Sequence, residues 1–385
     1  MDLTPSPPEL TNNGRSLRTP AAGKVSLARQ IALDLARQIE DGALAPGQKL
    51  PWREELCKHY NVSVITIRAA LADLTSKGLI ESRKRGGIFV SASAKMSPEF
   101  ASDTFAMVAK FASSNFCAHI LAGATAAAHR AGFRVTVAAT IDDPELEASY
   151  IQELADRVAG VLVVPVNHSE SDLSAFKRLV ERKRNLVFVD HYVEGVDAPR
   201  VTSDNIRGGY LATCALLETG CGRIYALSSG KNTTSSRERM QGYNQAMQEH
   251  GRLFDPSLIR RSPLDPFEAG RQMCREILDQ QREPARFGIF AITEVIAAGC
   301  YSAIKEAGLR IPEDVAVAGY DDFHGAVMDP PLTTVRQNLY RLGELGVETL
   351  LKVSRGETAS SQLVPVELVV RRSTSGEESL HGGTA

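Results

Sequence analysis

The chain has 385 residues, of which 43% are hydrophobic and 23% charged, and these are the values of a globular protein rather than of a disordered or membrane protein. No segment approaches the roughly 18–20 uninterrupted apolar residues of a membrane span, no secretory signal opens the chain, and the six scattered cysteines form no C-x-x-C pair, so we expect a cytoplasmic protein with reduced thiols. The formal net charge of −2 is unevenly distributed, because residues 24–91 carry eleven Lys and Arg against seven Asp and Glu, which favours contact of that segment with nucleic acid.

The N-terminal part of the chain predicts a tail followed by two helices. Residues 1–22 are rich in Pro, Ser, Thr and Asn, which is typical of a disordered segment. Ser26 can cap a helix that ends at Gly42, and the turn at 45–47 leads to a second helix over roughly 52–59. Four apolar residues at four-residue spacing form the stripe of the first helix: Leu27, Ile31, Leu35 and Ile39.

A third helix and a hairpin follow. Ser63 is a suitable N-cap, and Gly78 ends the helix that begins after it. Its buried face is predicted to contain Ile67, Ala70, Leu71 and Leu74, and its opposite face Val64, Ile65, Thr66, Arg68 and Ala69. The apolar runs 79–80 and 88–90 then flank a cationic tip at 83–87, which predicts a β-hairpin suited to phosphates or to the minor groove. Together these elements predict a winged helix-turn-helix of α+β type over residues 23–91 that binds DNA.

A family resemblance supports this interpretation. The run IEDGALAPGQKLPWREELCKHYNVSVITIRAALADLTSKGLI resembles the GntR-type winged-helix repressors, and the similarity covers about residues 24–91. Two departures are evident, since Trp52-Arg53-Glu54 stand where the family has Ser-Glu-Arg, and Val64 stands where it has an arginine. The residues expected to contact DNA are Arg53, Ser63, Val64, Ile65, Thr66, Arg68, Arg83, Lys84 and Arg85. Exposed apolar side chains among them suit thymine methyl groups. Trp52 is expected to pack between the helix and the wing or linker rather than to wedge into DNA.

Strand and helix patterns alternate from Thr104 onward, after an interdomain linker expected over 92–103. Short runs of Val, Ile, Leu and Ala predict strands at 105–109, 133–139, 160–165, 186–190, 223–228, 287–292 and 314–319. Helical patterns lie at roughly 117–131, 145–157, 171–183, 205–218, 237–250, 267–281 and 294–307. Continuous apolar strands separated by helices are typical of parallel sheets covered on both faces. A break near 201–205 divides the region into two similar α/β lobes, and we expect a ligand between them at the carboxyl ends of the strands.

Several segments of this region resemble the effector domain of LacI/GalR-type repressors, which is shared with periplasmic sugar-binding proteins. They are SSNFCAHILAGATAAAHRAGF, AGVLVVP, LVFVD, SDN, SSRERMQGY, IPEDVAVAGYDD and DPPLTTVRQNLYRLGELGVETLL. The resemblance covers nearly all of 104–372 and implies a two-lobed α/β periplasmic-binding-protein-like fold of type I that senses a ligand and dimerises. It also implies that the helix after Gln337 returns to the first lobe and that a strand near 362–371 returns to the second. Residues 373–385, rich in Gly, Ser and Glu, are expected to form a disordered tail. A GntR-type DNA-binding domain joined to a LacI-type sensor is the architecture of arabinose-repressor-like regulators.

The resemblance assigns ligand contacts to six positions, which are Asn115, Phe116, Asp190, Arg239, Thr293 and Asp321. Arg239 stands in the family's Arg-x-x-Gly-aromatic element and would fork onto hydroxyls or a carboxylate, while Asp321 matches a sugar-binding aspartate. Thr293 and Glu294 replace the Asn-Asp pair of the family. A purely structural role for Asp190 stays open, Asp204-Asn205 are expected to cap a helix, and His191 is expected either to line the pocket or to face water.

These features indicate a ligand-responsive transcriptional regulator. They favour a homodimeric repressor of carbohydrate-utilisation genes that a small sugar or sugar derivative releases from double-stranded operator DNA. No zinc, dithiol, phosphate-loop or nucleophile-elbow motif supports an enzyme, and no metal or cofactor is expected. Two alternatives stay open: a sugar-modifying enzyme on the same scaffold, and a regulator that uses its ligand as a corepressor or activator. A transport binding protein is disfavoured by the missing signal peptide and the fused DNA-binding unit.

Overall fold

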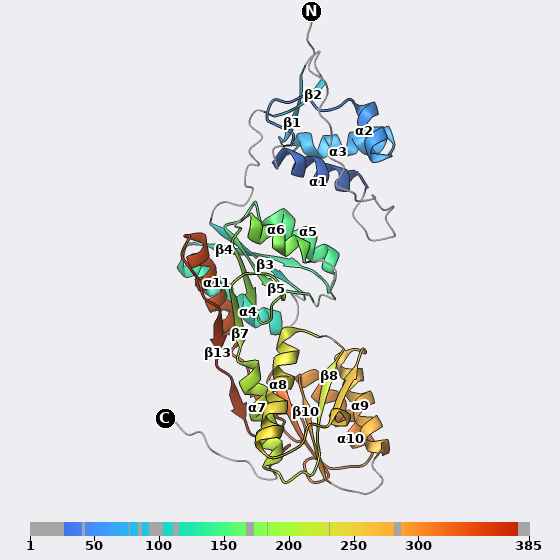
Figure 1. The fold of residues 1–385 in the computed structure, drawn as a ribbon, viewed down its shortest axis with the longest axis vertical. Helices are drawn as coiled ribbons and strands as arrows, with labels where there is room; N and C mark the ends of the chain where they lie inside the picture. Colours follow the sequence, from blue (N-terminus) through green and yellow to red (C-terminus); the bar gives the residue numbers. More distant parts are fainter. Residues whose placement is uncertain are drawn as a thin grey trace, which may run out of the picture. The chain divides into compact units, whose positions relative to one another are not determined.

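The computed structural model of the chain describes residues 27–40, 43–76, 78–83, 87–91, 103–110, 115–166, 173–182, 184–230, 232–280 and 286–375. They belong to two compact units, residues 1–99 and 100–385 (Figure 1). The predicted tail at 1–22, residues 92–102 of the predicted linker, the caps Ser26 and Gly42, and the wing residues Lys84 and Arg85 lie outside the described residues. No helix in the described part of the chain is long and apolar enough to cross a membrane.

The first unit is a winged helix-turn-helix, as predicted. It consists of α1 (Leu27–Glu40), α2 (Arg53–Tyr60), α3 (Val64–Ser76) and an antiparallel hairpin of β1 (Ile80–Arg83) and β2 (Gly87–Val90). Its core contains the apolar side chains that the helical periodicity predicts, among them Ile31, Leu35, Ile67, Leu71 and Leu74. Helices of this length are marginal alone, and burial of each large apolar side chain contributes about 1.5–3 kcal/mol to their stability.

The first lobe of the second unit is built around a six-stranded sheet in the order β13-β7-β6-β5-β3-β4, with all neighbours parallel. Its strands are β3 (Thr104–Ala109), β4 (Arg134–Ala139), β5 (Gly160–Val164), β6 (Leu186–Val189), β7 (Arg200–Ser203) and β13 (Gln362–Val364). Its helices are α4 (Asn115–Arg130), α5 (Pro144–Leu154), α6 (Ser174–Glu181) and α11 (Leu339–Ser354). Strand β3, between β5 and β4, is buried along its whole length, which is why it reads as a continuous apolar run.

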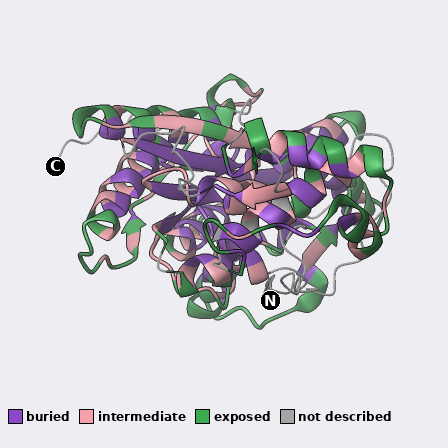
Figure 2. Cartoon of the chain, turned by 90° about the horizontal axis from the view of Figure 1, so that it is seen from above, coloured by how far each residue is buried: buried purple, intermediate pink, exposed green. Residues whose placement is uncertain are grey.

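The second lobe has a sheet in the order β14-β12-β11-β10-β8-β9, parallel except for the edge pair β12–β14. Its strands are β8 (Ile224–Ser229), β9 (Ile259–Ser262), β10 (Phe287–Ala291), β11 (Val315–Asp321), β12 (Thr333–Arg336) and β14 (Glu367–Val369). Its helices are α7 (Asn205–Leu217), α8 (Thr234–Glu249), α9 (Pro266–Gln280) and α10 (Glu294–Glu306), with short 3-10 turns at Pro256–Leu258 and Gly325–Val327. Figure 2 shows buried strands inside and exposed residues on outer helix faces and loops.

The structure confirms the seven predicted strands and seven predicted helices of this unit, with ends shifted by a few residues. One expectation holds only in part, and another is wrong. Within the segment 362–371, β14 joins the second lobe as predicted, but β13 pairs with β7 of the first lobe. The predicted C-terminal tail begins too early, because Ser373 is fully buried and its Oγ donates to the Val317 carbonyl at 2.6 Å and accepts the Thr333 N–H at 2.7 Å.

Glycines allow helices to cross with their backbones in contact. A Cβ on Gly123 of α4 would lie 1.9 Å from the Tyr340 carbonyl oxygen of α11, so α11 does return to the first lobe, as predicted. In the second lobe, a Cβ on Gly209 of α7 would lie 2.0 Å from the Arg239 carbonyl oxygen of α8. Alanine is too large at either position without displacement of a helix. The close approach of α7 and α8 brings the first residue of α7 within reach of the Arg239 side chain.

Candidate functional site

The recognition helix α3 presents a mixed apolar and cationic surface. Val64 and Ile65 are 46% and 78% exposed, and Arg68 is exposed and has no ion-pair partner among the described residues. Ser63 caps the helix, since its Oγ accepts the Thr66 N–H at 3.3 Å, and it lies 3.0 Å from the Thr66 hydroxyl. The helix can therefore offer a guanidinium, two hydroxyls and methyl groups to the edges of bases.

The base of the wing adds cations and the single tryptophan of the chain. The Trp52 side chain is 57% exposed, and the Lys49 ammonium lies 4.4 Å from its ring centroid. A Cβ on Gly87 would lie 3.9 Å from the Trp52 ring, so Trp52 does lie beside the wing, but it is not buried there as a packing residue would be. Arg83 is 2.7 Å from Glu81 and stacks on Phe89 at 4.6 Å.

Arg53 is exposed in the first turn of α2.

In the second unit, a buried polar network centres on Arg239, which is only 5% exposed. Its Nε donates to Asn205 Oδ1 at 3.0 Å and its Nη1 donates to the Ile292 carbonyl at 2.8 Å. The guanidinium also lies over the Tyr320 ring, 3.7 Å from the centroid, and 3.6 Å from Asp321 Oδ1. A guanidinium so restrained is preorganised, since little rotamer entropy remains to be lost when a ligand binds.

Asp321 connects this network to the first lobe. It ends β11 with a φ of 98°, a left-handed backbone conformation that residues other than glycine rarely adopt. Its Oδ1 accepts from Gln337 Nε2 at 2.8 Å, and Gln337 Oε1 accepts from the Ser203 hydroxyl at 2.7 Å. Burial raises the pKa of Asp321, and the Arg239 guanidinium opposes that shift.

A second carboxylate lies at the end of β6. Asp190 is 6% exposed, has a φ of 73°, and its Oδ1 is buried without a hydrogen-bond partner among the described residues. Its Oδ2 lies 2.8 Å from Nδ1 of His191, whose Nε2 lies 2.8 Å from the Pro165 carbonyl oxygen. His191 is therefore buried against backbone and does not face water. An unsatisfied buried carboxylate oxygen is costly, which marks the position as one that a donor can complete.

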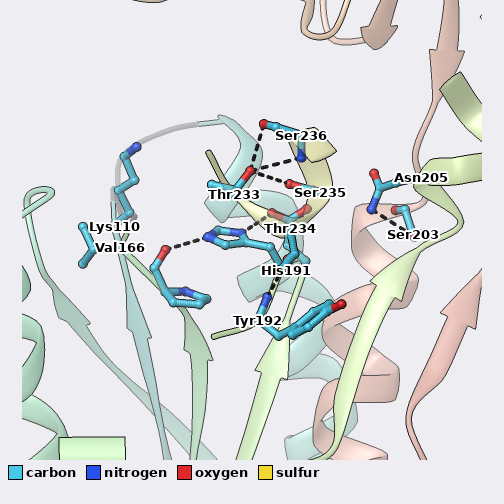
Figure 3. Close-up of polar contacts among 12 residues, drawn as sticks. Lys110, Val166, His191, Tyr192, Ser203, Asn205, Thr233, Thr234, Ser235 and Ser236 are labelled. Atoms are coloured by element: carbon cyan, nitrogen blue, oxygen red, sulfur yellow. Dashed lines mark hydrogen bonds and ion pairs between the residues drawn. The ribbon is translucent and has the colours of Figure 1, made fainter. Parts of the chain in front are cut away.

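The lobes also meet at the N-terminus of α8. The Tyr192 N–H, from the first lobe, donates to the Thr234 hydroxyl at 3.1 Å (Figure 3). Tyr192 Oη and Asn205 Nδ2 donate to the two oxygens of Glu238 at 3.5 and 3.0 Å. Burial raises the pKa of Glu238, and its bond from Asn205 partly opposes the shift.

The other predicted ligand residues lie at the edge of this network. Asn115 and Phe116 begin α4, where Phe116 meets Phe323 of the second lobe edge to face at 6.4 Å between centroids. Thr293 caps α10 and accepts the Ile296 N–H at 3.4 Å. Glu294 is engaged inside its own lobe, because its two oxygens accept the N–H groups of His324 and Gly325 at 2.6 and 3.1 Å. Because both carboxylate oxygens of Glu294 accept these N–H groups, Glu294 is not available to bind a ligand. No group of residues suited to hold a metal ion occurs in the described part of the chain.

Comparison with known proteins places the chain in a family. Residues 27–90 match the family of bacterial regulatory proteins of gntR type, and residues 213–374 match a periplasmic binding protein-like domain. The HTH-type transcriptional regulator DegA of Bacillus subtilis is 30% identical over 274 residues, which cover 70% of this chain and 80% of DegA. The chain belongs to the LacI-type transcriptional regulators.

Other relatives of this LacI-type regulator support the assignment. The ribose operon repressor of Haemophilus influenzae is 31% identical over 240 residues, covering 62% of this chain and 70% of the repressor. Among solved structures, the transcriptional regulator CelR in complex with cellobiose is 25% identical with a TM-score of 0.63, covering 84% of this chain and 99% of CelR. The relatives are regulators rather than enzymes.

Sequence reasoning did not assign three polar residues to the Arg239 and Asp321 network of this LacI-type regulator, which are Asn205, Glu238 and Gln337. Asp204 does cap α7 by accepting the Arg207 N–H at 3.0 Å, as predicted, but Asn205 next to it is 1% exposed and joins the Arg239 network. All three residues lie inside segments that resemble the family, which are SDN, SSRERMQGY and DPPLTTVRQNLYRLGELGVETLL. Their position in these segments was the only sequence signal for the three residues.

Proposed function

We propose that the chain represses carbohydrate-utilisation genes and that a small sugar bound between the lobes releases it from its operator. The observation that carries the proposal is the unpartnered, buried Oδ1 of Asp190, which can accept a hydroxyl donor. Asp321 and Arg239 provide a further acceptor and donors. Sugars are named for two relatives, ribose for the H. influenzae repressor and cellobiose for CelR, which supports this class of effector.

On the DNA side, we propose that Ser63, Val64, Ile65, Thr66 and Arg68 of the α3 region enter the major groove. Arg53, Arg83 and the wing residues Lys84 and Arg85 are proposed to contact the backbone or the minor groove. The exposure of Arg68 and the methyl-rich start of α3 support this arrangement. Operator binding of this kind supports a cytoplasmic location.

We propose that the sensor units pair as a homodimer through α4. This helix exposes small side chains along one side, at Ala118, Ala122 and Thr125, and these line a shallow apolar hollow. Small residues on a helix surface allow close approach of a second copy, and a twofold dimer would match a pseudo-palindromic operator. Effector binding that favours one lobe arrangement would then alter the spacing of the two DNA-binding units, with a coupling of about 1–3 kcal/mol.

The test uses full-length protein and an operator selected in vitro from random DNA. Operator affinity is measured by fluorescence anisotropy with and without a panel of sugars. We expect at least one sugar to weaken operator binding. A sugar that tightens binding would instead identify a corepressor, and conversion of a sugar into a product, followed by chromatography, would identify an enzyme. If no panel member changes operator affinity, the proposed sugar response is refuted.

A further inference from the structure

A second polar pocket lies at the carboxyl end of β8, outside the acid-rich centre of the cleft. It is a small hollow of about 20 Å³, and the wider space of about 250 Å³ around it includes open solvent. Its polar lining comes from three elements and their loop: Ser228, Ser229, Asn232, Ser236, Arg237 and Arg261. None of these residues was assigned a role by the sequence.

The charge of this lining is positive. Two guanidinium groups and no carboxylate line the pocket. Arg261 is exposed and has no ion-pair or hydrogen-bond partner among the described residues. Arg237 is 2.7 Å from Glu194, and its Nη1 donates to the Asn232 carbonyl at 2.8 Å. The network around Arg239 differs from this lining, because it contains the carboxylates of Asp190 and Asp321 as well as a guanidinium. Burial raises the pKa of Asp321, and the charge of Asp190 adds to that shift while Arg239 opposes it.

The pocket also contains hydrogen-bonding groups that have no partner in the described part of the chain. Ser229 is 9% exposed, lines the pocket, and its hydroxyl has no hydrogen-bond partner among the residues that the structure describes. The N-terminus of the 16-residue helix α8, capped by Thr233 through the Ser236 N–H at 3.2 Å, opens onto the same space through Ser236 and Arg237. Helix N-termini, hydroxyls and guanidinium groups are the donors that bind phosphate in proteins.

The pocket adjoins the Arg239 network. Ser228 follows Leu227, whose carbonyl accepts the Ile292 N–H at 3.1 Å, and the Ile292 carbonyl accepts from Arg239 at 2.8 Å. The pocket and the Arg239 network therefore lie at the ends of the adjacent parallel strands β8 and β10.

We propose that this pocket binds a phosphoryl group and that the effector is a sugar phosphate. A phosphoryl dianion has three oxygens that match the hydroxyl and guanidinium donors of the lining. This inference rests on the proposed sugar-responsive function and specifies the class of sugar.

The experiment compares full-length wild type with two variants in phosphate-free buffer. Arg261→Ala removes the free guanidinium. Arg260→Ala is the matched control, since Arg260 is the neighbour on β9 but donates to Gln280 at 3.0 Å and lies near Tyr225, away from the pocket. Inorganic phosphate, ribose, ribose 5-phosphate, glucose and glucose 6-phosphate are titrated, and binding is followed by thermal shift and calorimetry. Ser229→Ala repeats the test with a milder change.

We expect inorganic phosphate to bind, and a phosphorylated sugar to bind at least tenfold more tightly than both its unphosphorylated counterpart and inorganic phosphate. Arg261→Ala should lose most of that advantage, while Arg260→Ala retains it. Absence of phosphate binding to wild type, or unchanged phosphate and sugar-phosphate affinity in Arg261→Ala, overturns the inference. Phosphate binding without any gain from an attached sugar also overturns it. If a neutral sugar releases the operator equally from wild type and Arg261→Ala, the proposed function stands and only the phosphoryl assignment fails.

Discussion

Asp321→Asn tests the effector site with little change of shape. Asparagine keeps one oxygen, which can still accept from Gln337, but it removes the charge beside Arg239. At 3.6 Å and an effective dielectric constant near 20, the gross attraction lost is about 4–5 kcal/mol. Burial nevertheless raises the pKa of Asp321, so the cost of removing its charge from water exceeds that attraction, and the substitution relieves this cost.

Arg239 is not left without partners in this variant. It retains its hydrogen bonds to Asn205 and Ile292 and its stacking on Tyr320. We therefore expect Asp321→Asn to lower the free energy of unfolding by no more than about 2 kcal/mol. Arg239→Ala removes all of these contacts and leaves a buried carboxylate, so it should cost about 3–5 kcal/mol. Urea unfolding of both variants measures the difference.

Effector affinity should respond to these substitutions differently from the free energy of unfolding. A lost hydrogen bond to a charged group costs about 1.5–3 kcal/mol, so Asp321→Asn should weaken effector affinity at least tenfold and leave operator affinity without effector near wild type. Calorimetry with the effector found in the panel, and anisotropy with the selected operator, measure the two quantities. Asp329→Asn is the control, because that side chain is 88% exposed on the surface of the same lobe. Normal effector affinity in Asp321→Asn, with the fold intact, would refute the placement of the ligand beside Asp321.

Four further outcomes are expected. Arg68→Ala should weaken binding to the selected operator by about 1–3 kcal/mol if it contacts a base, and Arg83→Ala should reduce the salt slope by about one unit if it contacts a phosphate; unchanged titrations would exclude both roles. Trp52 is the single tryptophan, so operator addition should change its emission, and a constant spectrum would show that the base of the wing stays away from DNA. Because burial raises the pKa of Glu238, its contribution to stability is fully present below the ordinary glutamate pKa and is lost as pH rises through the raised value. The melting temperature of Glu238→Gln relative to wild type should therefore increase from about pH 4 to pH 7, and a constant difference would contradict the assignment.

The sequence by itself determined the long elements of the chain. Apolar spacing located α1 and α3 of the first unit, because each buries one continuous stripe, such as Ile31 and Leu35 in α1. The turn at 45–47 located α2, in which Leu56 is the buried residue. It also located strands that are buried on both faces, such as β3 and β10, since these read as uninterrupted apolar runs. Motifs drew attention to Arg239 and Asp321, which lie together in the second unit.

Short strands did not carry enough signal to be found in this way. The missed strands β7, β9 and β12 have only four residues, and they contain exposed or polar side chains. The single strand predicted near 362–371 is two strands of three residues each, β13 and β14. Whether such a short segment forms a strand depends on the neighbouring strand with which it makes backbone hydrogen bonds. The chain near 362–369 shows this dependence, because β13 joins one lobe and β14 the other within a few residues.

Only the tertiary structure decided which polar groups share the cleft. Asn205 and Arg239 are 34 positions apart, and Ser203 and Gln337 are 134 apart, so no local periodicity relates them. No described residue donates a hydrogen bond to Oδ1 of Asp190. This property can be recognised only when the positions of all the residues around Asp190 are known. Hydrophobic periodicity is a property of one helix or strand, whereas hydrogen-bond satisfaction depends on all the elements that meet at a site. The pocket beside Ser229 and Arg261 is likewise formed by several elements and could not be predicted from any one of them.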